Sequence, residues 1–140
     1  MKNVLVTGRF DMLHSGHVTF LKTAAQYGNV YVGIGSDSSI EILKKRKTII
    51  PEQERLYMVK AIRYVTDAWI NEGVGNMDFD ACFWKHNVIF DMLIVNEEQN
   101  FEFKRDFCKH FGMEYIVLPR IPEHGMTTRS STFMRKYHDK

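Results

Sequence analysis

The chain has 140 residues, of which 44% are hydrophobic and 26% charged, a composition typical of one folded domain rather than of a disordered protein. Its formal net charge of +2 is too small to indicate a nucleic-acid-binding protein, and no apolar run approaches the roughly 20 residues that cross a bilayer. No signal-peptide pattern precedes the first strand-like run. We therefore expect a single domain over residues 1–140, without membrane insertion, in the cytoplasm.

Strand-like and helix-like segments alternate along the chain. Short apolar runs predict strands over residues 1–6, 30–35, 67–71, 92–95 and 115–118. Helical spacing of apolar residues predicts helices over residues 15–27, 51–63, 78–86, 101–111 and 130–137, with a weak helical turn over 40–43. This alternation predicts an α/β fold: a Rossmann-like, doubly wound, five-stranded parallel sheet in the order 3-2-1-4-5, with helices on both faces.

The stretch TGRFDMLHSGH, residues 7–17, joins the first strand to the first helix. A strand-to-helix turn of this kind holds anions, because free backbone N–H groups and the positive end of the helix dipole converge there. Two histidines at this spacing also occur as ordinary helix caps. The stretch lacks both the Gly-x-Gly-x-x-Gly dinucleotide fingerprint and the Gly-Lys-Ser/Thr of a P-loop. A nucleoside triphosphate site remains the favoured interpretation.

A basic cluster, KKRK at residues 44–47, follows the second predicted strand. A run of charges is usually a solvated loop. Its place near the carboxyl end of a strand, where ligands bind in doubly wound sheets, makes a phosphate-facing loop equally plausible.

Two motifs at opposite ends of the chain carry a family resemblance. The sequence FDMLHSGH, residues 10–17, resembles the signature of the cytidylyltransferase-like nucleotidyltransferases, and RSSTFMR, residues 129–135, resembles their second signature. Among single-domain members, the chain is most similar to glycerol-3-phosphate cytidylyltransferase. The resemblance implies attack of a phosphate or phosphonate oxygen on the α-phosphorus of a nucleoside triphosphate, with release of pyrophosphate. It also implies Mg²⁺ or another divalent cation, bound mainly through the triphosphate, and a homodimer.

The resemblance assigns roles residue by residue. The catalytic group comprises His14, His17, Lys44, Arg129 and Ser130. The nucleotide-binding group comprises Thr7, Gly8, Arg9, Phe10, Gly16, Arg63, Asn96, Arg120, Ser131 and Thr132. The acceptor-binding group comprises Asp11, Lys45 and Arg55, where Arg55 is placed by its position on the following helix and is equally plausible as a surface helix arginine. Asp11 has two open roles, in positioning the motif or in metal binding, and Lys45 and Lys47 remain alternatives to Lys44. Arg120 is expected to contact the base.

The expected function is transfer of CMP from CTP to a small phosphorylated or phosphonate acceptor. The run NEEQN at residues 96–100 departs from the Gly-Asp-Asp-Trp-like run of glycerol-3-phosphate cytidylyltransferase, so the acceptor is open among polyol phosphates, sugar phosphates and phosphonates. The alternative is an adenylyltransferase of the same superfamily that uses ATP, with a flavin or sugar-phosphate acceptor. A nucleotide-binding module without catalysis is a third possibility, against which His14, His17 and Lys44 argue.

Overall fold

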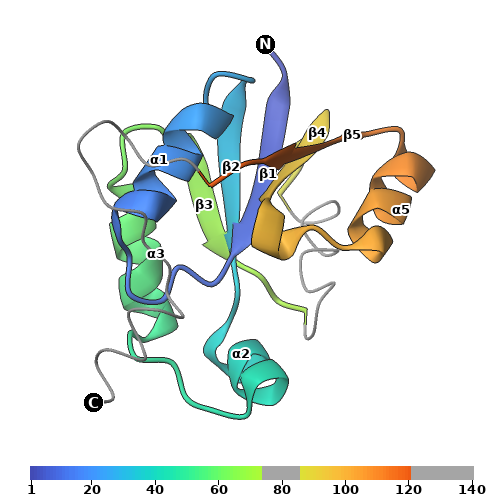
Figure 1. Cartoon of the computed structure of the whole chain (residues 1–140). Helices are drawn as coiled ribbons and strands as arrows, with labels where there is room; N and C mark the ends of the chain where they lie inside the picture. Colours follow the sequence, from blue (N-terminus) through green and yellow to red (C-terminus); the bar gives the residue numbers. More distant parts are fainter. Residues whose placement is uncertain (74–85, 121–140) are drawn as a thin grey trace.

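The computed structural model describes residues 1–73 and 86–120, and within them one parallel sheet (Figure 1). Its strands are β1 (Asn3–Gly8), β2 (Asn29–Ile34), β3 (Asp67–Ile70), β4 (Met92–Asn96) and β5 (Glu114–Leu118). Their order is β3-β2-β1-β4-β5, and every neighbouring pair is parallel. The predicted fold class and strand order are confirmed.

In the part of the chain that the structure describes, four helices and one short 3-10 helix connect these strands. They are α1 (Ser15–Ala24), α2 (Asp37–Lys44), α3 (Glu52–Lys60), η2 (Glu97–Gln99) and α5 (Glu102–Phe111). The helix predicted over residues 130–137 lies outside the described residues, as does that over 78–86 apart from its last residue. Gly112 ends α5 in the left-handed conformation (φ 68°), as its sequence position predicts.

The helix α2 is longer than the weak turn expected over residues 40–43. Ser36 provides the reason, because its hydroxyl accepts a hydrogen bond from the backbone N–H of Ser39 at 3.1 Å and so caps the helix. Asp37 then adds a negative charge in the first turn, where it complements the helix dipole. Pro51 is the N-cap of α3 and not its first residue, a shift of one position from the expectation.

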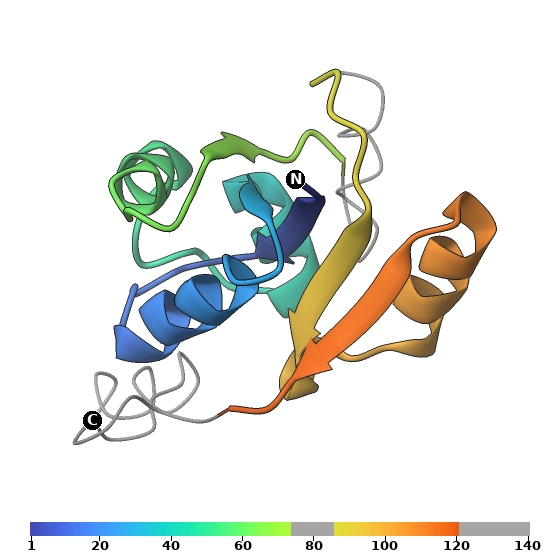
Figure 2. The ribbon, with the colours of Figure 1, turned by 90° about the horizontal axis from the view of Figure 1, so that it is seen from above.

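Two apolar clusters cover the two faces of the sheet (Figure 2). Val4 and Val6 of β1 face α1 and α3, in a cluster that includes Leu21 and Val59. Leu5 lies in the other cluster, with Leu93 of β4 and Cys108 of α5. Successive residues of a strand point to opposite faces, so a strand buried on both sides reads as an unbroken apolar run.

The carboxyl ends of all five strands lie at one edge of the sheet, the lower edge in Figure 1. This edge brings together the segments that follow β1, β2, β4 and β5, and α2 lies just beyond it. The strand order reverses between β1 and β4, where ligands bind in such sheets. Among the described residues, no helix is long and apolar enough to cross a membrane.

Candidate active site

His14 and His17 close the first turn of α1 with a reciprocal pair of hydrogen bonds. His14 is the N-cap, and its Nδ1 accepts from the backbone N–H of Gly16 at 3.0 Å. The Nδ1 of His17 accepts from the backbone N–H of His14 at 3.2 Å. This is a capping box in which two imidazoles replace the usual hydroxyl and carboxylate. The rings stack, with centroids 3.9 Å apart and planes at 26°.

The capping box also determines which ring nitrogen carries the proton. A nitrogen that accepts a hydrogen bond has no proton of its own, so in the neutral imidazole the proton resides on the other nitrogen. Both Nδ1 atoms accept from the backbone, and both Nε2 atoms are therefore N–H donors. The helix cap and an anion-binding role are thus compatible in the same two side chains.

Burial and neighbouring cations keep His17 neutral. Its pKa is lowered from 6.5 to about 3, first by burial and then by the charges of His14, Arg120 and Arg9. The Phe10 ring lies against the His17 ring, with centroids 5.1 Å apart. The site therefore combines a neutral His17 imidazole with the permanent charges of the two arginines.

A second group of cations lies between the β1 turn and α2. The pKa of Lys44, the last residue of α2, is lowered below its usual value, first by the charge of Arg9, then by burial and by Arg46. Like charges this close repel one another in the absence of an anion, and a triphosphate relieves that repulsion. Lys44, Lys45 and Lys47 are all exposed, and Arg46 is half-buried. Exposure therefore does not separate the lysines of the basic cluster, and Lys44 is distinguished by the charge of Arg9 that acts on it.

Arg120 and Asn96 lie where β5 and β4 end, on the far side of the switch point from β2. Arg120 pairs with Glu98 of η2 at 3.0 Å, and its backbone N–H donates to the carboxylate of Glu97 at 3.0 Å. Asn96 caps η2 by accepting from the backbone N–H of Gln99 at 3.0 Å. Residues 96–100, the NEEQN run, thus form a compact turn beside Arg120. The helix η2 within this turn was not predicted from the sequence.

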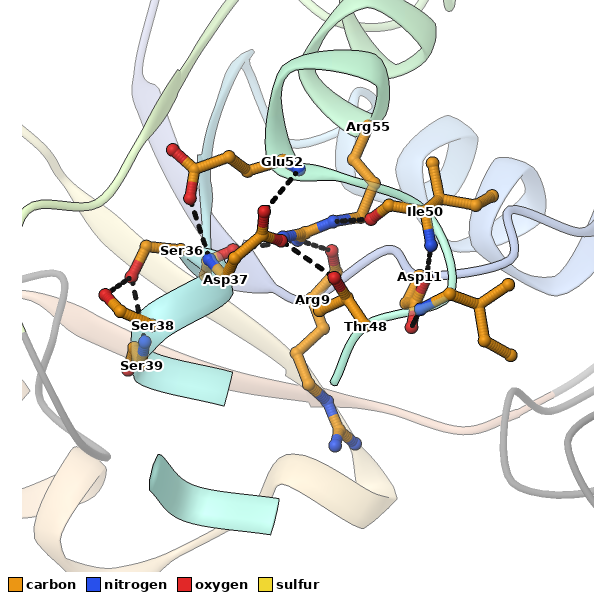
Figure 3. A network of polar contacts seen from close by, with 12 residues as sticks. Arg9, Asp11, Ser36, Asp37, Ser38, Ser39, Thr48, Ile50, Glu52 and Arg55 are labelled. Carbon is orange, nitrogen blue, oxygen red and sulfur yellow. Dashed lines mark hydrogen bonds and ion pairs between the residues drawn. The ribbon is translucent and has the colours of Figure 1, made fainter. Parts of the chain in front are cut away.

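Asp11 and Arg55, both expected to bind the acceptor, have structural partners instead (Figure 3). Asp11 is 2% exposed, and its two carboxylate oxygens accept from the backbone N–H groups of Ile49 and Ile50 at 2.9 and 2.8 Å. Arg55 is 1% exposed and donates to three backbone carbonyls and to Asp37. Both side chains are buried and directed to partners within the protein, so the structure presents neither of them to an acceptor.

Arg63 lies at the opposite edge of the sheet from the histidines. It follows α3 and precedes β3, which is parallel to β1, so it occupies the amino edge, and its guanidinium lies 5.0 Å from the ring centroid of Tyr64. Its place in the chain is thus at the end of the sheet away from the expected nucleotide site. Thr7 and Gly8 end β1, and Gly16 lies in the first turn of α1, all at the expected edge.

The residues of the second motif cannot be placed in the same way. Arg129, Ser130, Ser131 and Thr132 lie outside the described residues. Within residues 1–73 and 86–120, no group of three or more His, Cys, Asp or Glu side chains could hold a metal ion.

A network around Asp37 was missed by the sequence reasoning (Figure 3). The carboxylate of Asp37 accepts from Thr48 Oγ1 at 2.9 Å, from the backbone N–H of Glu52 at 3.2 Å and from Arg55 at 2.7 Å. Glu52 reciprocates, because its carboxylate accepts from the backbone N–H of Asp37 at 2.8 Å. A serine and an aspartate at the start of a helix predict a cap, but no local pattern predicts the partner helix.

The comparison with protein families decides the family of this chain. The family model described as cytidylyltransferase-like matches residues 5–135. The chain belongs to the cytidylyltransferase-like family. It is a nucleotidyltransferase by this membership, and the His14–His17 pair is the part of the described structure that carries the family motif.

Several curated relatives of this cytidylyltransferase-like protein carry one name. The FAD synthase of Methanohalophilus mahii is 51% identical over 98 residues, 65% of this chain and 68% of the relative. That of Thermococcus kodakarensis is 32% identical over 133 residues, 92% of this chain and 85% of the relative. That of Pyrococcus horikoshii is 41% identical over 123 residues, 85% of this chain and 79% of the relative.

These relatives overturn the expected CTP-dependent function. Transfer of CMP from CTP, as in glycerol-3-phosphate cytidylyltransferase, is wrong as the main prediction, because relatives at up to 51% identity are FAD synthases. The error has a physical reason: the expectation rested on a motif that the resemblance assigns to the triphosphate, and a triphosphate is the same in CTP and ATP. A lipopolysaccharide core biosynthesis protein from Thermoplasma volcanium has the same fold, with a TM-score of 0.66 at 24% identity over 87% of this chain and 98% of its own.

Proposed function

We propose that this protein is an FAD synthase that transfers AMP from ATP to the phosphate of FMN. The observation that carries the proposal is the shared name of relatives that align over most of the chain, the FAD synthases of T. kodakarensis and P. horikoshii among them. The geometry supports it through the donor pair His14–His17 and the cations around it. This reaction matches the adenylyltransferase alternative and its flavin acceptor.

The reaction needs no general base. A phosphate monoester such as FMN has a second pKa of about 6, so its oxygen is already ionised near pH 7. That oxygen forms a bond to the α-phosphorus of ATP, the bond from the α-phosphorus to the bridging oxygen breaks, and pyrophosphate leaves with the electron pair. The protein must hold two anions in line and stabilise the charge that develops on the leaving group.

The residues at the carboxyl edge fit that task. We assign the Nε2–H groups of His14 and His17 to the phosphate oxygens of ATP, since backbone donors occupy both Nδ1 atoms. We assign Arg9 and Lys44 to the charge of the two anions, and Arg120 to the nucleotide. Preorganised donors and cations of this kind contribute most where water is excluded.

Two further assignments rest on the family motifs. Arg129, Ser130, Ser131 and Thr132 are assigned to the β- and γ-phosphates on the resemblance alone. Mg²⁺ is assigned to the triphosphate, and when bound it neutralises charge on the leaving pyrophosphate.

Pyrophosphate release tests the proposal across substrates. The protein is incubated with Mg²⁺ and each of ATP and CTP, against FMN, glycerol 3-phosphate, a sugar phosphate and a phosphonate. We expect release with ATP and FMN together and background release with every other pair. Faster release with CTP, or with a non-flavin acceptor, would contradict it.

A further inference from the structure

Arg55 is a buried cation whose hydrogen bonds join four separate segments (Figure 3). Its Nε donates to the carbonyl of Ile50 at 2.9 Å. One terminal nitrogen donates to the carbonyls of Arg9 and Gly35, at 2.6 and 2.7 Å, and the other to Asp37 Oδ1 at 2.7 Å. The side chain has no exposed surface, whereas that of Asp37 is 39% exposed. Only a planar guanidinium has enough donors to satisfy four acceptors at once.

Each of these partners belongs to a segment that forms the candidate site. Arg9 lies between β1 and the histidine pair, and Gly35 follows β2. Asp37 begins α2, the helix that ends at Lys44, and Ile50 closes the loop that returns from it. Arg55 therefore fixes the backbone on both sides of the cationic group, although its own guanidinium faces away from solvent.

Other contacts attach the same loop. Asp37 binds Thr48 and Glu52, and Asp11 binds the backbone of Ile49 and Ile50. In Figure 3 the guanidinium of Arg9 points away from this network, whereas its carbonyl joins it. The network thus holds the main chain of Arg9 and the start of α2 together, while the charged ends of Arg9 and Lys44 repel each other.

We infer that Arg55, paired with Asp37, is a positioning residue that holds Lys44 and Arg9 in place for phosphoryl chemistry at the His14–His17 edge. The inference rests on the proposed function. Arg55 touches no substrate; it acts through the segment 35–50. Without this anchor the mutual repulsion of the cations drives α2 outward until an anion binds. A site that is already assembled reacts faster than one assembled by each substrate.

A double-mutant cycle tests this inference. Arg55→Lys keeps the positive charge but removes the planar guanidinium, whose N–H groups bind four acceptors. Lys44→Ala removes the ammonium group that Arg55 is inferred to hold in place. We expect Arg55→Lys alone to lower kcat for FAD formation about 10-fold or more, with KM for ATP changed less than about 3-fold. In the Lys44→Ala background the same change should lower kcat by less than about 3-fold, because the two residues act as a unit. Equal losses in both backgrounds would overturn the inference.

Two controls separate positioning from a loss of stability. Cys108→Ala creates a cavity in the cluster on the opposite face of the sheet, and it should lower the melting temperature while leaving kcat unchanged. Arg105→Lys, on the outer surface of α5, should change neither. If Arg55→Lys does not fold, Asp37→Asn replaces it in the cycle. A fall in kcat with Cys108→Ala equal to that with Arg55→Lys would contradict positioning.

Amide hydrogen exchange tests the anchoring role of Arg55 without requiring that the protein catalyse the proposed reaction. We expect Arg55→Lys to speed amide exchange in α2 and residues 45–50 about 10-fold, without change in α5. If the wild-type protein forms no FAD, the proposed function is wrong. The exchange rates still test whether Arg55 holds α2 and residues 45–50 in place, because they do not depend on the reaction. Unchanged exchange in residues 37–50, or equal acceleration in α5, would refute the anchoring role.

Discussion

The Nδ1 atom of His17 accepts a hydrogen bond from the backbone N–H of His14, whose own Nδ1 accepts from Gly16. One set of contacts thus caps α1, stacks the two rings and leaves both Nε2–H groups as donors. Sequence reasoning treats a capping pair and an anion-binding pair as competing explanations. In this fold they are the same arrangement, because the cap supplies the orientation that the donors need.

His17→Ala removes one of these donors and one half of the cap. We expect turnover to fall about 10²-fold or more, the typical cost of losing a preorganised donor to developing charge. Steady-state kinetics with saturating substrates measure the effect. His110→Ala, an exposed residue near the end of α5, is the matched control and should leave turnover unchanged. Near-normal turnover of the His17 variant would contradict the assignment of His17 as a donor to the phosphates.

The low pKa of His17 predicts an acid-sensitive fold. The folded protein keeps this imidazole neutral down to about pH 3, whereas in the unfolded chain it takes up a proton near pH 6.5. The unfolded state therefore binds more protons between these values, and stability falls with decreasing pH by up to about 1.4 kcal/mol per unit. Urea unfolding from pH 7.5 to 4.5 measures the slope. His17→Gln should flatten it, and an unchanged slope would contradict the burial of a neutral imidazole.

Lys44→Ala should weaken catalysis more than Lys47→Ala. Lys44 shares the field of Arg9, and a hydrogen bond to a charged group contributes about 1.5–3 kcal/mol, which corresponds to a loss of about 10-fold or more. Lys47 lies in the loop beyond α2, and we expect its loss to change kcat/KM by less than about 2-fold. The two variants are compared at the same low ionic strength. Equal small effects of the two substitutions would indicate that the basic cluster is a solvated loop without a role in catalysis.

Asp11→Asn should destabilise the fold without weakening acceptor binding. The amide nitrogen of Asn meets a backbone N–H where the carboxylate offered a second acceptor, which leaves that N–H unsatisfied at a cost of about 1–3 kcal/mol. Urea unfolding measures the loss, and KM for FMN should remain within about 2-fold. A raised KM in a protein of unchanged stability would restore the acceptor-binding role.

The sheet could be predicted from the sequence because its central strands are buried on both faces. Val4–Val6 and Met92–Val95 read as apolar runs for that reason, and strand order follows from the rules of right-handed crossovers. The histidine motif could be placed because it follows β1 directly. The length of α2 was underestimated, because its start depends on the Ser36 cap more than on apolar spacing.

The role of Arg55 and the identity of the nucleotide could not be predicted. The partners of Arg55 lie up to 46 residues away in the chain, and no local pattern links Arg55 to Arg9. The histidine motif is assigned to the triphosphate, which is identical in ATP and CTP, so it could not indicate the base. Asn96 and Arg120, at the ends of β4 and β5, lie where such information would reside.

Direct detection of the flavin product tests the central claim. The protein is incubated with FMN, Mg²⁺ and either ATP or CTP, and the flavins are separated by chromatography, with the His17→Ala variant as the control for contaminating activity. We predict FAD from ATP, a kcat/KM for ATP at least about 10²-fold above that for CTP, and loss of the product with the variant. No FAD from ATP, or a flavin–cytidine product formed faster from CTP, would contradict the account.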